Sequence, residues 1–500
     1  MNPAATKIGN ITRLTVGERN VNHTNRTILF VGETGGGKST LVNTLVNYAM
    51  GVTWEDEVWF KIVKEEQKKQ SESQTLDIIV YELFGFEGQV LPFSLTLIDT
   101  PGYGATQGTR EDDIVTARLY DLFQSPDGVE EIAAVALVVQ ASTNRLSDRL
   151  RYIFNSVMSL FGKDMEKNII LLISNSDGMT PTNVFTALKE ANVKFAKNEK
   201  NQPINFLFNN CQDKHRTEED EDALEFAFKI SRKGMTGFKN FLKTNKPQNV
   251  EESRKVLRER SRLTACIQNL QARIDCIALK QTEIKQTRES VKKCDKGMQE
   301  FVFVLDEVYK EEEPIGSGWW VLGLFNDGAT RCTHCKENCH YPGCIFAPSA
   351  GKCEVMKRGR CTSYTNKCPV SCHVKDKKMY VTKTRRVKMT VKEVEEKYGL
   401  HIEEHKTSKE RNLSLLEYLE KQLRDLKHNM SQLLDEAFHH VVRLDEIALI
   451  TNSLSTHVHL DGLIKVMKEE GEEDKAKRLE EVQKQLDKGL LGAMNYMRKS

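Results

Sequence analysis

The sequence predicts an α/β domain with a central, mostly parallel sheet flanked by helices. It is followed by a long antiparallel α-helical coiled coil with a small Cys-rich module at its tip. Three observations predict this arrangement. A glycine-rich loop joins an apolar strand to a helix early in the 500-residue chain, two later stretches have heptad spacing, and eight of the twelve cysteines fall between Cys332 and Cys372.

The glycine-rich loop has the pattern G-x-x-x-x-G-K-[ST], which cradles nucleotide phosphates. Residues 27–31 before it form an apolar strand run, and residues 40–46 after it have helical apolar spacing. We expect Lys38 to reach the β- and γ-phosphates and the Ser39 hydroxyl to hold Mg²⁺. A glycine-rich turn with a chance Lys-Ser pair is the alternative. The candidate nucleotide-binding residues of this P-loop are Gly32, Thr34, Gly35, Gly36, Gly37, Lys38, Ser39 and Thr40.

Two further strands end in residues suited to a nucleotide. Residues 95–98 lead into Asp99-Thr100-Pro101-Gly102, where Asp99 can contact Mg²⁺ through water and the Gly102 N–H can sense the γ-phosphate. Residues 169–173 lead to Asp177, whose carboxylate can accept hydrogen bonds from guanine. Asn175 stands where guanine-specific proteins have Lys, which leaves the choice of base open, and Asp177-Gly178 can also be a simple turn.

The order of these motifs resembles that of the septin-like and immune-associated nucleotide-binding GTPases, over roughly residues 26–245. The resemblance implies GTP and Mg²⁺ as ligands, a base-contacting loop at Asn209 and Asn210, and pairing of G domains in a homo-oligomer. Thr75 is the candidate switch residue that gives Mg²⁺ a second hydroxyl, although Ser/Thr-rich loops are common.

Catalysis by this domain is expected to be slow. Tyr103 follows Gly102, where fast Ras-like enzymes place a water-orienting Gln. Arg110 and Arg145 are candidates for a charge supplied to a partner's site, but most surface arginines only interact with solvent, so the catalytic residue stays unassigned. We expect a nucleotide-controlled assembly or scaffold switch. The alternatives are a chromosome-maintenance-like ATPase with a zinc hook and a nucleotide-bound scaffold that does not hydrolyse.

Heptad spacing predicts the antiparallel coiled coil, which we call the stalk. Residues 250–313 form the outgoing coiled-coil helix, with apolar seam positions from Leu263 to Leu305, and residues 391–455 form the returning helix, with a seam from Leu416 to Leu454. Pairing between two chains is the alternative to a hairpin. Residues 456–500 form a further helical segment, in which the acidic run 469–474 is expected to be a solvated face.

Between the two helices, residues 314–390 form the Cys-rich module with a β-hairpin. Its soft ligands have spacing that is typical of Zn²⁺ sites, they exceed one tetrahedral site, and disulfides are the alternative. The apolar residues 318–325 suit either the core of the module or a patch for a partner or membrane, and the basic residues 375–388 suit a hairpin. We expect this head to bind an unknown protein partner. The candidate zinc ligands are Cys332, Cys335, Cys339, His340, Cys344, Cys353, Cys361, Cys368, Cys372 and His373.

Composition limits the remaining possibilities. The chain is 39% hydrophobic and 29% charged, which fits two to four domains with a charged helical part. The net charge of +2 argues against nucleic acid as a partner. No apolar run has the length of a membrane span, and the N-terminal segment, residues 1–25, has no secretory signal pattern, so we expect the protein in the cytoplasm.

Overall fold

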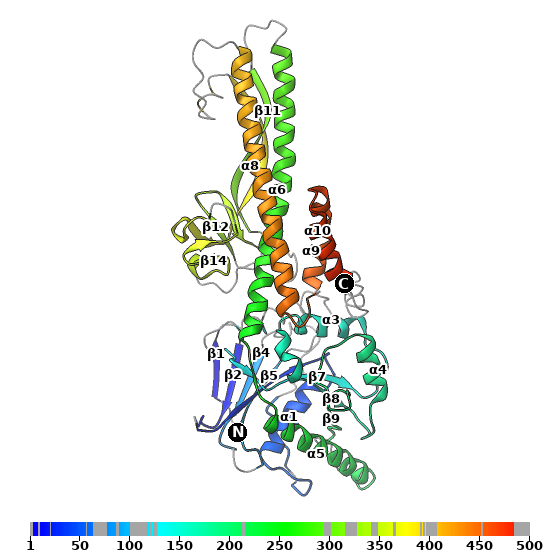
Figure 1. Ribbon diagram of the computed structural model, residues 1–500. Helices are drawn as coiled ribbons and strands as arrows, with labels where there is room; N and C mark the ends of the chain where they lie inside the picture. Colours follow the sequence, from blue (N-terminus) through cyan, green and yellow to red (C-terminus); the bar gives the residue numbers. More distant parts are fainter. Residues whose placement is uncertain are drawn as a thin grey trace.

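A computed structural model gives the architecture of the chain (Figure 1). It describes residues 4–8, 11–20, 22–56, 58–63, 78–86, 90–100, 118–119, 122–123, 128–212, 216–294, 302–315, 328–341, 349–363, 367–390, 393, 396, 408–451 and 454–484. The apolar segment 318–325 lies outside these residues.

The N-terminal half folds around an eight-stranded sheet with the order β1-β2-β4-β5-β3-β7-β8-β9. Strands β5, β3, β7, β8 and β9 run parallel to one another, and β4 is antiparallel to β5. The predicted parallel sheet is confirmed. The strands are β1 (Ala4–Ile8), β2 (Ile11–Val16), β3 (Asn25–Val31), β4 (Ile78–Leu83), β5 (Ser94–Asp99), β7 (Ala134–Gln140), β8 (Ile169–Ser174) and β9 (Asn205–Leu207).

The N-terminal strands belong to this sheet. The sequence-based boundary at residue 26 separated them from the GTPase domain, but β1 pairs with β2 and β2 pairs in parallel with β4. A charged contact reinforces the pairing, because Arg13 lies 2.7 Å from a carboxylate oxygen of Glu82 and the Thr15 hydroxyl donates to the other oxygen. The domain therefore begins at the first described strand.

Helices cover both faces of the sheet, and the strands bury side chains on both sides. Along β3, Ile28 and Phe30 pack towards α1 (Lys38–Ala49) and α5 (Glu221–Thr244). Leu29 and Val31 pack on the other face, which is covered by α3 (Asp148–Met158) and α4 (Thr182–Glu190). Two-sided burial explains why these strands are continuous apolar runs rather than alternating ones.

Two long helices, α6 (Glu251–Cys294) and α8 (Ser408–Ile447), form an antiparallel hairpin within the chain. Three contacts fix the direction: Glu259 with His440, Cys266 with Glu436, and Arg288 with Glu420. As the residue number rises on α6 it falls on α8. The seam residues Leu263, Leu270 and Ile277 of α6 and Met430 and Leu433 of α8 share one buried cluster, as the hairpin interpretation expects.

Both ends of the hairpin join the same corner of the N-terminal α/β domain. Helix α6 follows β10 (Gln248–Asn249), which pairs with β6 (Glu131–Ile132). The end of α8 meets the turn between α3 and the short 3₁₀ helix η1 (Lys163–Asn168), where the Leu449 N–H donates to the Phe161 carbonyl and Lys163 donates to the Asp445 carbonyl.

The outgoing helix is shorter than predicted. It ends at Cys294, and residues 302–313, which the heptad pattern assigned to the helix, lie in β11 (Val302–Pro314). This strand pairs along its whole length with β17 (Lys378–Thr390), so the predicted hairpin within residues 375–388 is also wrong. The run Val302-Phe303-Val304-Leu305 is rich in β-branched and aromatic residues, which favour a strand.

The β11–β17 ribbon carries the Cys-rich module back along the stalk, so the module does not sit at the tip (Figure 1). Arg273 of α6 lies 2.7 Å from Glu337 in the module, and Arg262 donates to the Glu354 carbonyl at 3.4 Å. The tip placement is wrong because the ribbon supplies a return path that heptads cannot reveal. The module contains β12 (Ala329–Cys332), β13 (Glu337–His340), η2 (Ala350–Lys352), β14 (Met356–Lys357), β15 (Arg360–Cys361), η3 (Val370–Cys372) and β16 (His373–Asp376).

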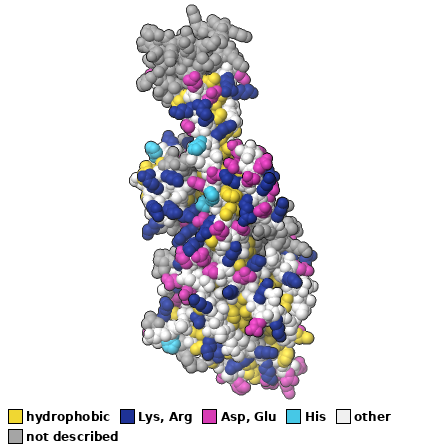
Figure 2. All heavy atoms as spheres, in the orientation of Figure 1, with side chains coloured by type: hydrophobic (Ala, Val, Ile, Leu, Met, Phe, Trp, Pro, Cys, Tyr) yellow, Lys and Arg dark blue, Asp and Glu magenta, His cyan; other side chains and the backbone are white. Residues whose placement is uncertain are grey.

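The basic residues of β17 face acidic residues of β11. Lys383 lies 3.0 Å from Glu311, and Arg385 lies 2.8 Å from Glu307. On the face drawn in Figure 2, Lys and Arg side chains lie among Asp and Glu side chains. Ion pairing with β11 thus accounts for part of the basic run that the sequence shows at residues 375–388.

The C-terminal segment forms two helices rather than one. Helices α9 (Leu454–Glu469) and α10 (Glu473–Lys484) are separated at Gly471, whose φ of 82° suits the left-handed turn. The acidic run 469–474 therefore spans a turn and not one helical face. Within the described part of the chain, each helix is too short or too polar to cross a membrane.

Acidification should destabilise the helical part through His459 on α9. This side chain is 8% exposed, and burial lowers its pKa to about 4. Because the unfolded chain binds a proton near the ordinary pKa of 6.5, stability is full above that value and is lost as the pH falls towards 4. Urea denaturation followed by circular dichroism should give about 2 kcal/mol less stability at pH 5 than at pH 7 from this group.

The variant His459→Leu should lose this part of the pH dependence. The matched control is His428→Leu, since His428 is an exposed histidine of α8, and this variant should keep the dependence. An unchanged pH profile in His459→Leu would show that His459 is not responsible.

Candidate functional site

The P-loop lies at the carboxyl ends of the parallel strands, where ligands bind in open α/β sheets. It begins directly after β3, and α1 begins at Lys38. Gly35 and Gly37 have φ of 77° and 94°, a left-handed conformation that favours glycine. A Cβ on Gly37 would also come within 3.2 Å of the Ser174 side chain. The loop therefore favours glycine at both positions, and Gly37 is the second glycine of the motif.

Lys38 lies inside the loop. Its side chain is 5% exposed, and its ammonium donates to the carbonyls of Gly32 at 2.8 Å and Glu33 at 3.0 Å. Burial lowers the pKa of Lys38 to about 8, which Asp99 and Glu33 partly oppose. A buried cation without a full counter-ion stabilises an incoming anion, so this position suits a phosphate.

Ser39 and Asp99 form the candidate magnesium position. The Ser39 hydroxyl lies 3.4 Å from Asp99 Oδ2, and within the described residues Asp99 Oδ1 is buried without a hydrogen-bond partner. Burial raises the pKa of Asp99 to about 6, against the effects of Lys38 and Ser39. A hydroxyl beside an under-satisfied carboxylate matches the oxygen ligands that Mg²⁺ takes directly or through water.

Three residues that the sequence analysis missed hold the loop from neighbouring strands and helices. The Ser174 hydroxyl at the end of β8 donates to the Gly36 carbonyl at 2.7 Å, and Gln140 at the end of β7 donates to the Gly35 carbonyl at 3.0 Å. Ser147, which caps α3, donates to Glu33 at 2.6 Å. Their only sequence signal is that Gln140 and Ser174 each end an apolar strand, β7 beside β3 and β8 beside β7.

The candidate base-reading residues come together at the next strand ends. The Ser176 N–H donates to the Phe208 carbonyl at 2.9 Å, which joins the Asp177 turn to the loop of Asn209 and Asn210. Asp177 Oδ1 accepts from the Met179 N–H at 2.9 Å, so the Asp177 side chain also stabilises the turn that follows it. The carboxylate is nevertheless exposed at the same edge of the sheet as the P-loop.

Asn209 and Asn210 are held in place by α5. The Asn209 N–H donates to the Ser231 hydroxyl at 2.9 Å, and that hydroxyl donates to Asn210 Oδ1 at 3.0 Å. Cys211 also contacts Asn209 Oδ1 at 3.2 Å. The amides are thus positioned by protein contacts, and a bound base would compete for or extend them.

The structure describes some of the remaining predicted site residues, and others lie outside the described residues. Thr34 is exposed on the P-loop, and the Thr40 carbonyl accepts from Thr44 within α1. Arg145 is exposed before α3. Thr75, Gly102, Tyr103, Arg110 and Cys344 lie outside the described residues.

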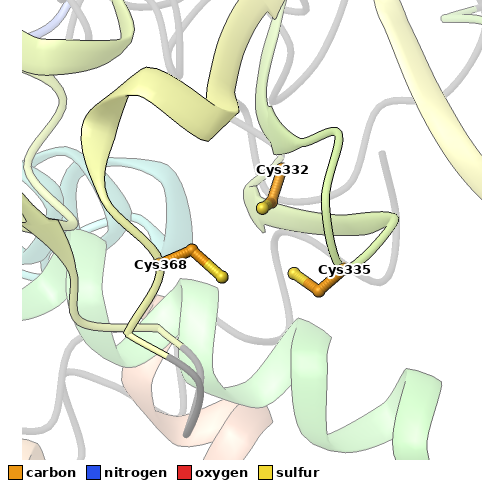
Figure 3. Close-up of side chains that lie close together, drawn as sticks. All are labelled: Cys332, Cys335 and Cys368. Atoms are coloured by element: carbon orange, nitrogen blue, oxygen red, sulfur yellow. The ribbon is translucent and has the colours of Figure 1, made fainter.

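The Cys-rich module gathers soft ligands into three sets. In each set the ligand atoms lie within 4.8 Å of one another. Figure 3 shows the sulfur atoms of the first set turned towards one another. The sets are Cys332, Cys335 and Cys368; Cys339, Cys361 and His373; and His340, Cys353 and Glu354.

One family model and a set of solved structures are similar to parts of this chain. Residues 22–113 match the family model for septins. Among solved structures, Toc33 from Arabidopsis thaliana bound to Mg²⁺ and GMPPNP is 17% identical, covering 45% of this chain and 88% of that one, with a TM-score of 0.30. A second structure is described as showing that dimerisation is important for the GTPase activity of the chloroplast translocon components atToc33 and psToc159. It is 17% identical and covers 46% of this chain and 87% of that one, with a TM-score of 0.31. No curated protein sequence matches the chain.

Proposed function

We propose that this chain, which carries a septin-like P-loop GTPase domain, binds GTP with Mg²⁺, hydrolyses it slowly and works as a nucleotide-controlled assembly switch or scaffold in the cytoplasm. The observation that carries the proposal is the arrangement of Lys38, Ser39 and Asp99 at the carboxyl ends of the parallel strands. A buried ammonium for phosphate lies beside a hydroxyl and carboxylate for Mg²⁺. The septin match covers this region.

We expect slow GTP hydrolysis because the sequence lacks the water-orienting Gln after the Asp-x-x-Gly motif. Tyr103 occupies the position after Gly102, and an aromatic side chain cannot orient the attacking water as the Gln of Ras-like enzymes does. A charge supplied by a second G domain can replace that contribution, since an arginine in trans increases the rate by about 10³ to 10⁵. We therefore propose that hydrolysis depends on pairing of two chains.

An exposed apolar pair supports such pairing. Met179 is 71% exposed and Phe226 is 58% exposed, the two largest exposures among the large hydrophobic side chains that the structure describes. Gly178 packs against Ile230 of α5, one helical turn after Phe226, so both exposed side chains lie beside the Asp177 turn. Apolar surface next to the nucleotide edge suits contact with a second copy.

Phosphate release should be measured against protein concentration, with GTP in excess. Pairing predicts that the rate per chain rises with concentration. The double variant Met179→Ser with Phe226→Ser should stay slow at all concentrations, whereas Val374→Ser, which changes an exposed hydrophobic residue of the Cys-rich module, should behave as wild type. A rate per chain that is constant over concentration would contradict pairing, and no release at all would favour the non-hydrolysing scaffold.

Asp177→Asn should weaken GTP binding by roughly 30-fold, about 2 kcal/mol, and raise the relative affinity for xanthosine triphosphate. An amide cannot accept both guanine donors, and its own NH₂ group would face them. The fold of the turn should survive, because an Asn Oδ1 can still accept from the Met179 N–H. Competition binding with GTP, ATP and xanthosine triphosphate measures the preference. An unchanged preference would assign base recognition to Asn209 or Asn210.

The position of the Cys-rich module argues against the alternative of a chromosome-maintenance-like ATPase with a zinc hook. A hook that joins two arms requires its cysteines at the apex of the stalk, and here the described cysteines of the module lie alongside α6. The septin match likewise favours a self-contained GTPase domain before the stalk.

A further inference from the structure

The Cys-rich module has a core made mainly of thiols. Its buried cluster contains Val355 and Ala265, the latter contributed by α6, and the remaining buried members are cysteines. Its strands are only two to four residues long. So small an apolar core is not enough to stabilise the fold of these short strands. Small modules of this kind are usually stabilised by disulfides or metals.

The first ligand set is built by a tight turn. Cys332 ends β12, Cys335 lies in the turn before β13, and Lys336 has a φ of 53°, a conformation that is uncommon for a non-glycine residue. Cys368 brings a third sulfur to the same point (Figure 3). Cys372 is tied to this turn, because its carbonyl accepts from both the N–H and the hydroxyl of Thr333. Three thiols thus converge from two short segments, and the backbone of Cys372 holds a fourth cysteine beside the same turn.

The second set contains a histidine that is oriented as a metal ligand. His373 is 7% exposed, and its Nδ1 lies 2.8 Å from the Pro369 carbonyl. A carbonyl only accepts, so Nδ1 carries the proton and Nε2 has a lone pair. Within the described residues, Nε2 is buried without a hydrogen-bond partner, and the set places the ring beside the Cys339 and Cys361 sulfurs. A backbone carbonyl that fixes the second ring nitrogen is the usual arrangement for a metal-bound histidine.

The third set already pairs its members. His340 Nδ1 lies 3.1 Å from Cys353 Sγ and 3.3 Å from Glu354 Oε2. These contacts form a hydrogen-bonded group of one imidazole, one thiol and one carboxylate. We assign no metal to this set, so a substitution of His340 is the matched control for substitutions of the zinc ligands.

We propose that the module holds two zinc ions, each bound by a separate set. Thiolates and imidazole favour zinc, whereas magnesium and calcium take oxygen ligands. Four thiolates close the first site, and three protein ligands hold the second, whose fourth position is left to water or another donor. The first site contains Cys332, Cys335, Cys368 and Cys372, and the second contains Cys339, Cys361 and His373.

Native mass spectrometry of the full chain, with metal identified by elemental analysis, should find two zinc ions per chain. Cys335→Ser and His373→Asn should each leave one. His340→Asn should keep two, as should Cys276→Ser, which changes a cysteine of α6 outside all three sets. A chain without zinc, iron in place of zinc, or loss of an ion in His340→Asn would overturn this assignment. So would disulfides among the six assigned cysteines, seen as the loss of two hydrogens per pair.

A second measurement keeps the assignment testable if a variant fails to fold. In His373→Cys a thiolate replaces the imidazole, so the protein should still bind two ions. After exchange of zinc for Co²⁺, its thiolate-to-metal absorption should exceed that of the wild type, because the number of thiolates rises from six to seven. An unchanged absorption would show that His373 does not bind the metal.

Discussion

Lys38→Ala is expected to lower the affinity for GTP by about 1,000-fold or more. The ammonium of Lys38 lies inside the P-loop, and its hydrogen-bond partners among the described residues are the carbonyls of Gly32 and Glu33. Charge-assisted hydrogen bonds to two phosphates account for about 4 kcal/mol, or three factors of ten in the dissociation constant. Isothermal titration calorimetry with GTP and Mg²⁺ measures the change.

The nucleotide-free variant should fold normally. Alanine is the best helix former, Lys38 begins α1, and the substitution removes a charge that burial disfavours. Lys200→Ala, which changes an exposed lysine of the same domain, should bind GTP as the wild type does. If Lys38→Ala kept wild-type affinity while folded, the phosphates would have to be recognised elsewhere and the site as described would be wrong.

Arg260→Met is expected to destabilise the protein by about 3 kcal/mol. Arg260 lies on α6 where three segments meet. Its Nε donates to the Ser159 carbonyl at 2.9 Å, and its two terminal nitrogens donate to the Thr456 hydroxyl at 2.7 Å and to the Ile450 carbonyl. Burial lowers its pKa to about 10, so it stays charged at neutral pH. Methionine keeps the aliphatic stem but leaves these acceptors without their donor.

The free energy of unfolding from urea denaturation, measured in the absence of nucleotide, tests this expectation. The matched control is Arg258→Met, two residues earlier on α6, where the side chain is 43% exposed and reaches Glu251 only at 3.9 Å. Exposed pairs contribute little, so that variant should change stability by less than about 0.5 kcal/mol. Equal effects of the two substitutions would mean that Arg260 does not hold the junction.

The sequence was most informative where a pattern is local. The P-loop requires glycines at left-handed positions and a lysine at the start of a helix, and all of these are adjacent in the chain. The pairing of α6 with α8 was also accessible, since heptads mark both helices. By contrast, Ser174 and Gln140 reach the P-loop from strands more than 100 residues away, and nothing in their own surroundings marks them.

The errors concern partners that are distant in sequence. Residues 302–305 fit both a heptad and a strand, and only β17, which begins at Lys378, decides between them. The same pairing moves the Cys-rich module from the tip to the side of the stalk. The division of its cysteines into sets likewise depends on strand pairing, because β12 places Cys332 opposite His373. Periodicity cannot specify such non-local contacts.

The attachment of both stalk helices to one corner of the GTPase domain makes the stalk a lever. Helix α6 has 44 residues and so extends about 66 Å from its base, at 1.5 Å per residue. If the turn around Phe161 and Lys163 rotated by about 5°, the far end would move by about 6 Å at that radius. The attachments of the Cys-rich module to α6, at Arg262 and Arg273, would move by about a quarter and about half of that distance. A small rotation at this turn would thus move the far end of α6 about twice as far as the part of α6 that contacts the Cys-rich module.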